Sequence, residues 1–195
     1  MNPIRLIRYA TDNAWESMEK KPSVMQMVWM YVVPLSLVPS VVLYLVVRTY
    51  PKLFMDILPG DRVMLVSMEL FVGQIVSILM MAWISRNLAE MVNLKPSFRD
   101  SLLVIATSVT PFWLVSVFYL IPSIPFNLVM HGIATLASIT LVYYGVNNIF
   151  GLKRRGAAAM LAGAIVCTAA LGFAVLLVCT LISWNDIQHL QFSLK

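Results

Sequence analysis

The sequence predicts an all-α membrane protein that crosses the bilayer five times, and three observations support this fold class. Of its 195 residues 60% are hydrophobic and only 12% are charged, whereas a globular domain usually has about 25% charged residues. The apolar residues form blocks of about 20 or more, the length that an α-helix needs to cross about 30 Å of hydrocarbon. The basic residues gather at the ends of these blocks. We therefore expect one helical membrane domain over residues 24–183.

Five blocks are long enough to be spans. They cover residues of about 24–47, 63–85, 101–121, 125–150 and 157–183. The first contains Pro34 and Pro39, and the third contains Pro111 near its middle. Prolines are tolerated in membrane helices where neighbouring groups satisfy the freed carbonyls, so we expect kinks that face the bundle.

The connections between spans are short. Pro122 and Pro125 predict a tight turn between the third and fourth spans, which makes these two spans a helical hairpin. Ser97 and Asp100 have the spacing of a capping box, in which the side chain of each residue satisfies a backbone N–H of the other. We therefore expect Ser97 to be the N-cap of the third helix.

Lysine and arginine positions predict the orientation, because cytoplasmic connections carry an excess of these residues. The N-terminal segment and the second and fourth connections carry ten of them, and the other side carries four. We expect a cytoplasmic N-terminus, with the first span both targeting and anchoring the chain. The C-terminal tail, residues 184–195, is then on the non-cytoplasmic side. Residues 1–23 have the pattern of an amphipathic helix in the cytoplasmic interface, with Trp15 at headgroup depth; a polar leader is the alternative.

Polar side chains within spans are costly and usually face the bundle interior. Two stripes at helical spacing stand out: Glu69, Gly73 and Ser77 on the second span, and Asn127, His131, Thr135 and Ser138 on the fourth. With neighbouring residues of the second and third spans, they define a candidate intramembrane polar site, which consists of Glu69, Gln74, Ser116, Tyr119, Asn127, His131 and Thr135.

Glu69 and His131 are the two titratable groups of this site that could form a pair. Each lies about six residues from the outer end of its span, so both sit roughly 9 Å deep. We expect them to form a hydrogen bond if the second and fourth spans touch. A carboxylate and an imidazole can form a proton relay in a transporter. The alternative interpretation, a buried structural pair or a Glu69 that reaches the outer headgroups, is the one we favour.

Other chemistry finds little support in the sequence. It contains no nucleophile elbow, no HExxH helix and no phosphate-binding glycine-rich loop. A Ser116/His131 dyad would lack an oxyanion motif. Cys167 and Cys179, on one helix about 18 Å apart, cannot form a disulfide with each other. We therefore expect no catalytic residues, no metal, no cofactor and no nucleic-acid partner.

The fifth span is rich in small residues at four-residue spacing, which lets membrane helices approach closely. Its candidate helix-packing residues are Ala159, Gly163, Cys167 and Gly172. Packing within the chain is the first use that we expect of them, and homo-oligomerisation is the alternative.

The order of these features resembles the Yip family, whose name stands for the Ypt/Rab-interacting protein domain, and specifically its bacterial branch. The quoted stretches are "AWESMEKKPSVMQMVWMYVVPLSLVPSVVLYL", "LLVIATSVTPFWLVSVFYLIPSIPFNLV" and "LVYYGVNNIFGLKRRGAAAMLAGAIV". The positions that carry the resemblance are Trp15, Pro34, Pro111, Pro122, Tyr144, Gly145 and Gly151.

The resemblance implies five spans, a cytoplasmic N-terminus and a bacterial inner (plasma) membrane. Eukaryotic relatives bind Rab GTPases through a longer acidic leader, and because that leader is missing we expect no Rab-type partner. The sequence as a whole favours a non-enzymatic scaffold or helper that acts through the lipid bilayer, a membrane-protein partner or a homo-oligomer. The alternative function is a small channel or transporter that uses the Glu69/His131 region.

Overall fold

The chain was analysed as a computed structural model, which describes residues 23–51 and 63–192. These residues form helices joined by short connections, and no strand occurs among them. Five stretches are long and apolar enough to cross a membrane: Val24–Thr49, Val63–Met91, Phe98–Leu120, Ile124–Asn148 and Arg155–Val175. The predicted all-α, five-span fold is confirmed. The predicted interfacial helix lies outside the described residues except for Ser23.

The bounds of the elements show where each span departs from a plain α-helix. In chain order the elements are α2 (Val24–Met27), the π-helical turn η1 (Val28–Val32), α3 (Val33–Thr49), α5 (Val63–Met91), α6 (Phe98–Val115), the 3-10 helix η2 (Ser116–Leu120), α7 (Ile124–Asn148) and α8 (Arg155–Phe192). The second helix thus runs to Met91, past the apolar block, and the last continues through most of the residues that we expected to be a tail.

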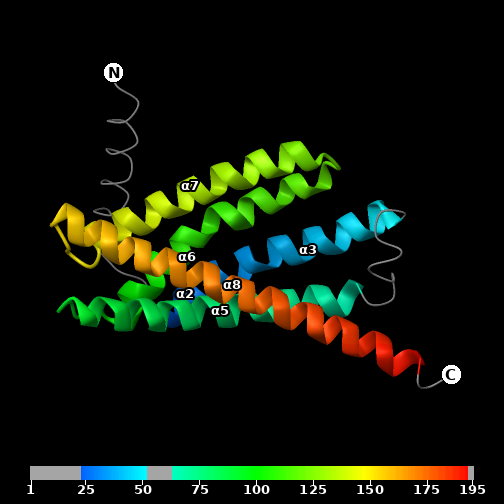
Figure 1. The fold of residues 1–195 in the computed structure, drawn as a ribbon, viewed down its shortest axis with the longest axis horizontal. Helices are drawn as coiled ribbons and strands as arrows, with labels where there is room; N and C mark the ends of the chain where they lie inside the picture. The colour runs from blue at the N-terminus through cyan, green and yellow to red at the C-terminus, as the bar shows by residue number, and fades with distance from the viewer. Residues whose placement is uncertain (1–22, 52–62, 193–195) are drawn as a thin grey trace.

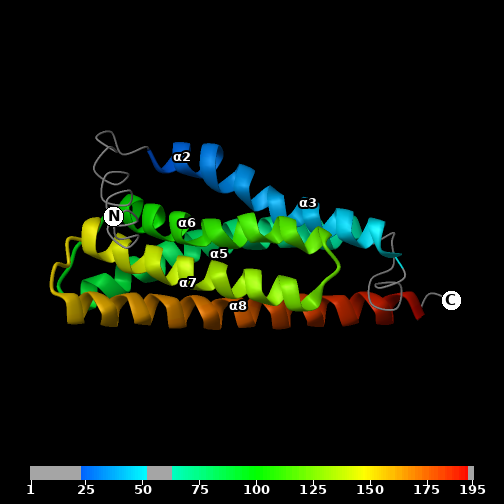
Figure 2. The ribbon, with the colours of Figure 1, turned by 90° about the horizontal axis from the view of Figure 1, so that it is seen from above.

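The helix α6 is the centre of the bundle. It packs on α7 and α5 and also contacts the first span. Within the apolar window of this span 56% of the residues are buried, compared with 22% in α8 and 6% in α7. Figure 1 shows α5 and α7 on opposite sides of α6, and Figure 2 shows the first span and α8 on opposite faces of the bundle.

The first span contains the π turn because a proline follows it. Pro34 has no N–H for the carbonyl four residues earlier, and its ring would clash with that carbonyl. In η1 the chain widens instead, and the Val33 N–H bonds to the Val28 carbonyl five residues earlier. Pro34 itself is exposed, whereas Pro39 and Pro111 are partly buried. The expectation that prolines face the bundle is therefore wrong for Pro34.

The α5–α6 connection is built from two helix-ending motifs. At the end of α5 the Leu94 N–H bonds to the Ala89 carbonyl and the Asn93 N–H to the Glu90 carbonyl, while Asn93 has a φ of 61°. This is a Schellman motif, which satisfies the last carbonyls of a helix. The predicted capping box then begins α6: the Ser97 side chain accepts from the backbone N–H of Asp100, and the Asp100 side chain from that of Ser97. This prediction is confirmed.

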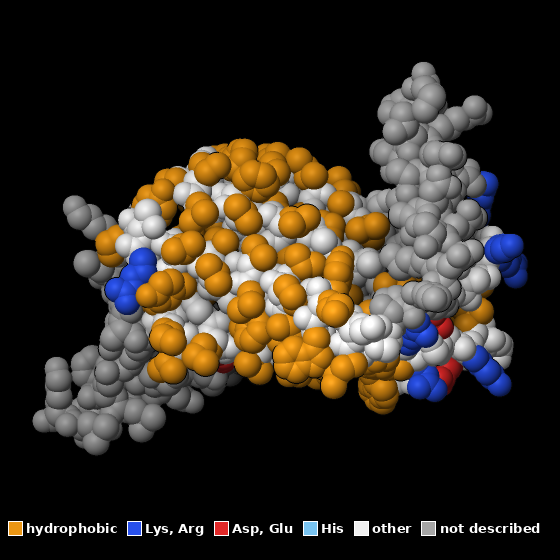
Figure 3. Space-filling view, turned by 180° about the vertical axis from the view of Figure 1, so that it is seen from behind, with side chains coloured by type: hydrophobic (Ala, Val, Ile, Leu, Met, Phe, Trp, Pro, Cys, Tyr) orange, Lys and Arg blue, Asp and Glu red, His pale blue; other side chains and the backbone are white. Residues whose placement is uncertain are grey.

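Charged side chains gather at one end of the bundle, where the α5–α6 and α7–α8 connections lie. We call this the basic end, and its described lysines and arginines are Arg86, Lys95, Arg99, Lys153, Arg154 and Arg155. Figure 3 shows lysine and arginine side chains at the edge of a broad hydrophobic surface. A hydrophobic band bordered by charge is the surface that a bilayer requires.

Candidate functional site

Four hydrogen bonds between helices end on one short stretch, Thr110–Leu120, which we call the central segment. The four residues outside it that supply the partner groups are Tyr31, Tyr50, Gln74 and His131. They come from η1, the end of α3, α5 and α7 respectively. The central segment therefore joins the other three of the first four spans through polar contacts.

Local chemistry gives the central segment its irregular backbone. Pro111 cannot donate to the carbonyl one turn earlier, and the Thr107 hydroxyl donates to the carbonyls of Leu103 and Val104 in the turn before it. At Ser116 the backbone changes from α6 to the 3-10 helix η2, and the buried Ser116 hydroxyl donates to the Trp113 carbonyl at 2.6 Å. Ser116 of the predicted site thus serves its own helix.

On the side of the central segment that faces the bundle interior, Trp113 makes the main contacts. Its side chain is 2% exposed, and its indole N–H donates to Gln74 Oε1 at 2.8 Å. The Tyr31 ring packs edge-on against it with centroids 6.4 Å apart, and the Tyr31 hydroxyl lies 2.5 Å from Thr110 Oγ1. Gln74 was predicted to belong to the site, and its partner is a buried tryptophan.

On the outer side, His131 joins the hairpin of α6 and α7. Its Nδ1 lies 2.9 Å from the Tyr119 hydroxyl, and its ring lies 5.1 Å from the Phe112 ring. Asn127 donates to the Ile121 carbonyl, and the Thr135 hydroxyl donates to the His131 carbonyl. Tyr119, Asn127 and His131 are therefore brought together, as predicted for one polar site, but they close a hairpin.

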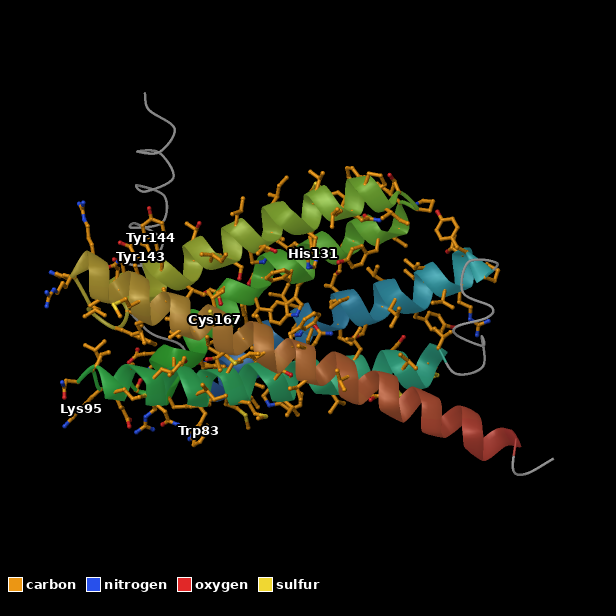
Figure 4. All side chains as sticks on the ribbon, viewed as in Figure 1. Trp83, Lys95, His131, Tyr143, Tyr144 and Cys167 are labelled. Atoms are coloured by element: carbon orange, nitrogen blue, oxygen red, sulfur yellow. The ribbon has the colours of Figure 1, made fainter. Side chains whose placement is uncertain are left out.

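The expected Glu69–His131 hydrogen bond is not made. Glu69 is exposed on α5 and has no hydrogen-bond or ion-pair partner in the described part of the chain. The physical reason is the packing order: α5 packs on α3, α6 and α8, whereas α7 packs on α6, α8 and η2. Figure 4 shows His131 on the α6–α7 side of the bundle, away from α5. The expected pair of stripes therefore does not face one shared cavity.

Few groups of the described bundle could hold a ligand. No three histidine, cysteine or carboxylate side chains lie close enough to bind a metal ion within the described residues. Four buried polar atoms there have no hydrogen-bond partner: Ser67 Oγ, Arg99 Nε, Ser101 Oγ and Asn127 Oδ1. They are scattered over α5, α6 and α7. Cys167 is a free and exposed thiol.

The small residues of α8 face away from the bundle. Ala159, Gly163, Cys167 and Gly172 are exposed, and a Cβ added at Gly163 or Gly172 would meet nothing within 4 Å. The helix packs through a neighbouring face, whose buried residues are Ala158, Leu161, Ala162 and Ile165. Packing within the chain, the first use expected of these four residues, is therefore wrong. Their use in a homo-oligomer stays a prediction.

Two glycines of the resemblance have a clear structural role. Gly145 is buried, and a Cβ there would lie 2.7 Å from Val104 Cγ1, so the absence of a side chain lets α7 approach α6. Gly151 has a φ of 74°, a conformation that L side chains rarely adopt.

Of the other positions of the resemblance, Tyr144 is partly buried beside Tyr143, and Pro122 is exposed in the hairpin turn. Trp15 lies outside the described residues.

Sequence reasoning missed Tyr31, Tyr50, Thr110 and Trp113. Of these four, only Thr110 had a signal in the sequence: it precedes Pro111, and a hydroxyl beside a helix-breaking proline often satisfies freed backbone groups. The partners across the bundle had no signal, since a tyrosine or tryptophan within an apolar run is equally compatible with the interior and the lipid-facing surface.

Fold and site together define a polytopic helical membrane protein whose polar interior links helices. The Yip1 domain family model matches residues 4–185, so the chain belongs to the Yip1 domain family. No curated protein and no solved structure was found to match the chain.

Proposed function

We propose that the protein is a non-enzymatic membrane scaffold or helper that acts through protein or lipid partners. The observation that carries the proposal is the use of polar groups in the described bundle. The hydrogen bonds of the central segment join helices to one another, and serine and threonine hydroxyls donate to the carbonyls of their own helices. A rigid bundle with a large apolar exterior is suited to holding other membrane components.

We further propose that the protein lies in a bacterial inner (plasma) membrane, with its N-terminus in the cytoplasm and its C-terminus outside. The support is the charge count, ten basic residues on one side and four on the other. A cysteine-accessibility experiment tests the orientation. In a variant without the two native cysteines, a cysteine at exposed Lys153 should react with a membrane-impermeant maleimide only after the cells are opened.

Transport through the Glu69/His131 region is the competing function, and the contacts of these residues weigh against it. The side chain of Glu69 is on the outer surface of α5, and His131 bonds to Tyr119. A conducting route would need polar groups in series through the bundle.

Flux in proteoliposomes separates the two functions. We expect vesicles that contain the protein to release protons and monovalent cations no faster than empty vesicles, with Glu69→Gln and His131→Asn variants behaving identically. Flux above the empty-vesicle rate that Glu69→Gln abolishes would overturn the scaffold proposal in favour of transport.

Photo-crosslinking in cells tests for a partner directly. A photoreactive residue at exposed Met160 or Leu136 should give discrete adducts, whereas one at buried Leu102, the control position, should give none.

A further inference from the structure

At the basic end, α5 and the connection to α6 enclose an open hollow of about 620 Å³. It is lined by Arg86, Glu90, Asn93, Leu94, Lys95, Pro96, Ser97 and Phe98. The Schellman motif and the capping box fix both sides of this connection, so the hollow has a defined shape in the folded protein. Its lining therefore combines charged side chains (Arg86, Glu90 and Lys95) with apolar ones (Leu94, Pro96 and Phe98).

The two cations of the hollow can reach an anion. Arg86 Nε donates to Glu90 Oε1 at 3.0 Å, which fixes the plane of the guanidinium and leaves its terminal N–H groups unpaired in the described part of the chain. Lys95 is exposed and has no ion-pair partner there either. A fork of N–H groups and an ammonium are the side-chain groups that bind phosphate.

Below the hollow, an apolar track follows the outer surface of α5. Val76, Met80 and Trp83 are 48%, 57% and 59% exposed, and their spacing of three to four residues places them in one stripe that leads to Arg86. The ten helical steps from Val76 to Arg86 rise about 15 Å, which is about half of the hydrocarbon thickness and so the depth of one leaflet. Figure 4 shows Trp83 pointing outward from α5 and Lys95 in the connection beyond the end of that helix.

We propose that this surface binds an anionic phospholipid of the leaflet at the basic end, which is the leaflet predicted to be cytoplasmic. The phosphate lies between Arg86 and Lys95 in the hollow, one acyl chain follows the track, and Trp83 stands at the boundary between them. The inference rests on the proposed scaffold role, to which it adds one specific lipid partner. A phospholipid headgroup and free inorganic phosphate both offer a phosphate to these cations, and the apolar track favours the phospholipid because only it has acyl chains.

The experiment is native mass spectrometry of the full chain in detergent, titrated with phosphatidylglycerol or with phosphatidylcholine of the same acyl chains. We expect one phosphatidylglycerol to be retained in preference to phosphatidylcholine. Removal of one cation near an anionic lipid should weaken that binding about fivefold, so Lys95→Ala should lose most of the preference. The matched control is Lys153→Ala, which removes the same charge from the α7–α8 connection and should leave the preference unchanged.

Two further arms distinguish the sources of the phosphate. Trp83→Ala should weaken the phospholipid but not the capture of inorganic phosphate, whereas competition by inorganic phosphate at equal concentration would assign the hollow to a free anion and overturn the proposal. Equal retention of the two lipids, or equal effects of Lys95→Ala and Lys153→Ala, would also overturn it. Lys95→Arg should restore binding. The flux assay on Lys95→Ala vesicles keeps the scaffold role separate, because a loss of lipid binding leaves that readout unchanged.

Discussion

The helices α6 and α8 are both apolar enough to span a membrane, and they are used in different ways. In α6 nine residues are buried between Ser101 and Val115, and the central segment at its end forms hydrogen bonds with three other spans. In α8 the residues from Ala170 to Val175 are all exposed. The comparison shows that apolar character gives the number of spans, while side-chain shape and polar partners decide which span is central.

The difference between α6 and α8 arises because the helices are surrounded by lipid and not by water. In a bilayer the hydrophobic effect does not drive helices together, because lipid chains are as apolar as leucine, so close packing and hydrogen bonds decide the arrangement. Bulky Trp113 and the glycine opposite Val104 give α6 such contacts. Exposed glycines and alanines of α8 are available for contacts of this kind but make none within the described chain. Substitutions in α6, in the spans that contact it and in α8 test this difference.

Removal of the Trp113 side chain should have the largest effect. Trp113→Ala leaves a cavity near the end of α6 and an unpaired Gln74 Oε1, and truncation of a buried aromatic costs about 3–5 kcal/mol. Unfolding in mixed micelles with increasing dodecyl sulfate measures the free energy of unfolding. Trp83→Ala is the control, since Trp83 is 59% exposed. Equal losses in the two variants would mean that α6 is not the central helix.

A side chain at Gly145 should open the contact between α6 and α7. Gly145→Ala places a methyl 2.7 Å from Val104 Cγ1, and overpacking of this kind costs about 1–3 kcal/mol. The same unfolding assay applies. Gly132→Ala on the same helix is the control, because a Cβ there meets nothing within 4 Å. The double variant Gly145→Ala/Val104→Ala should regain part of the loss, and a failure to do so would place the strain elsewhere.

Much of the fold was predictable from the sequence, because apolar length and basic residues report directly on the bilayer. The capping box at Ser97 was predictable for a different reason: it is a local motif that depends only on residues three positions apart. The site was predictable only in part. Gln74, Tyr119 and His131 do make polar contacts between helices, but the expected Glu69–His131 bond required α5 beside α7. Periodicity places residues on one face of a helix and does not say which helix lies opposite.

Loss of the Tyr31 hydroxyl should have a smaller effect than either core change. Tyr31→Phe keeps the edge-on contact with Trp113 and removes the hydrogen bond to Thr110. Hydrogen bonds between membrane helices contribute about 0.6 kcal/mol on average. A double-mutant cycle with Thr110→Val measures this coupling, and Tyr44→Phe, on the same span, serves as the control. A coupling energy of zero would mean that the hydrogen bond between Tyr31 and Thr110 does not stabilise the contact between the first and third spans.

The smallest effect on stability should follow a change on the exposed face of α8. Gly163→Leu adds a side chain where nothing lies within 4 Å, and surface changes usually stay within about 0.5 kcal/mol. If the small residues join two copies of the chain, the same change blocks the contact, so the oligomer should be lost while the unfolding free energy stays constant. In a Cys179→Ser background, oxidation should then cross-link two chains through exposed Cys167, and Gly163→Leu should prevent it, whereas Gly132→Leu on α7 should not. If the chain is monomeric with and without Gly163→Leu, this face of α8 contacts lipid. The difference between the two helices would then be that α6 is packed in the interior and α8 faces the bilayer.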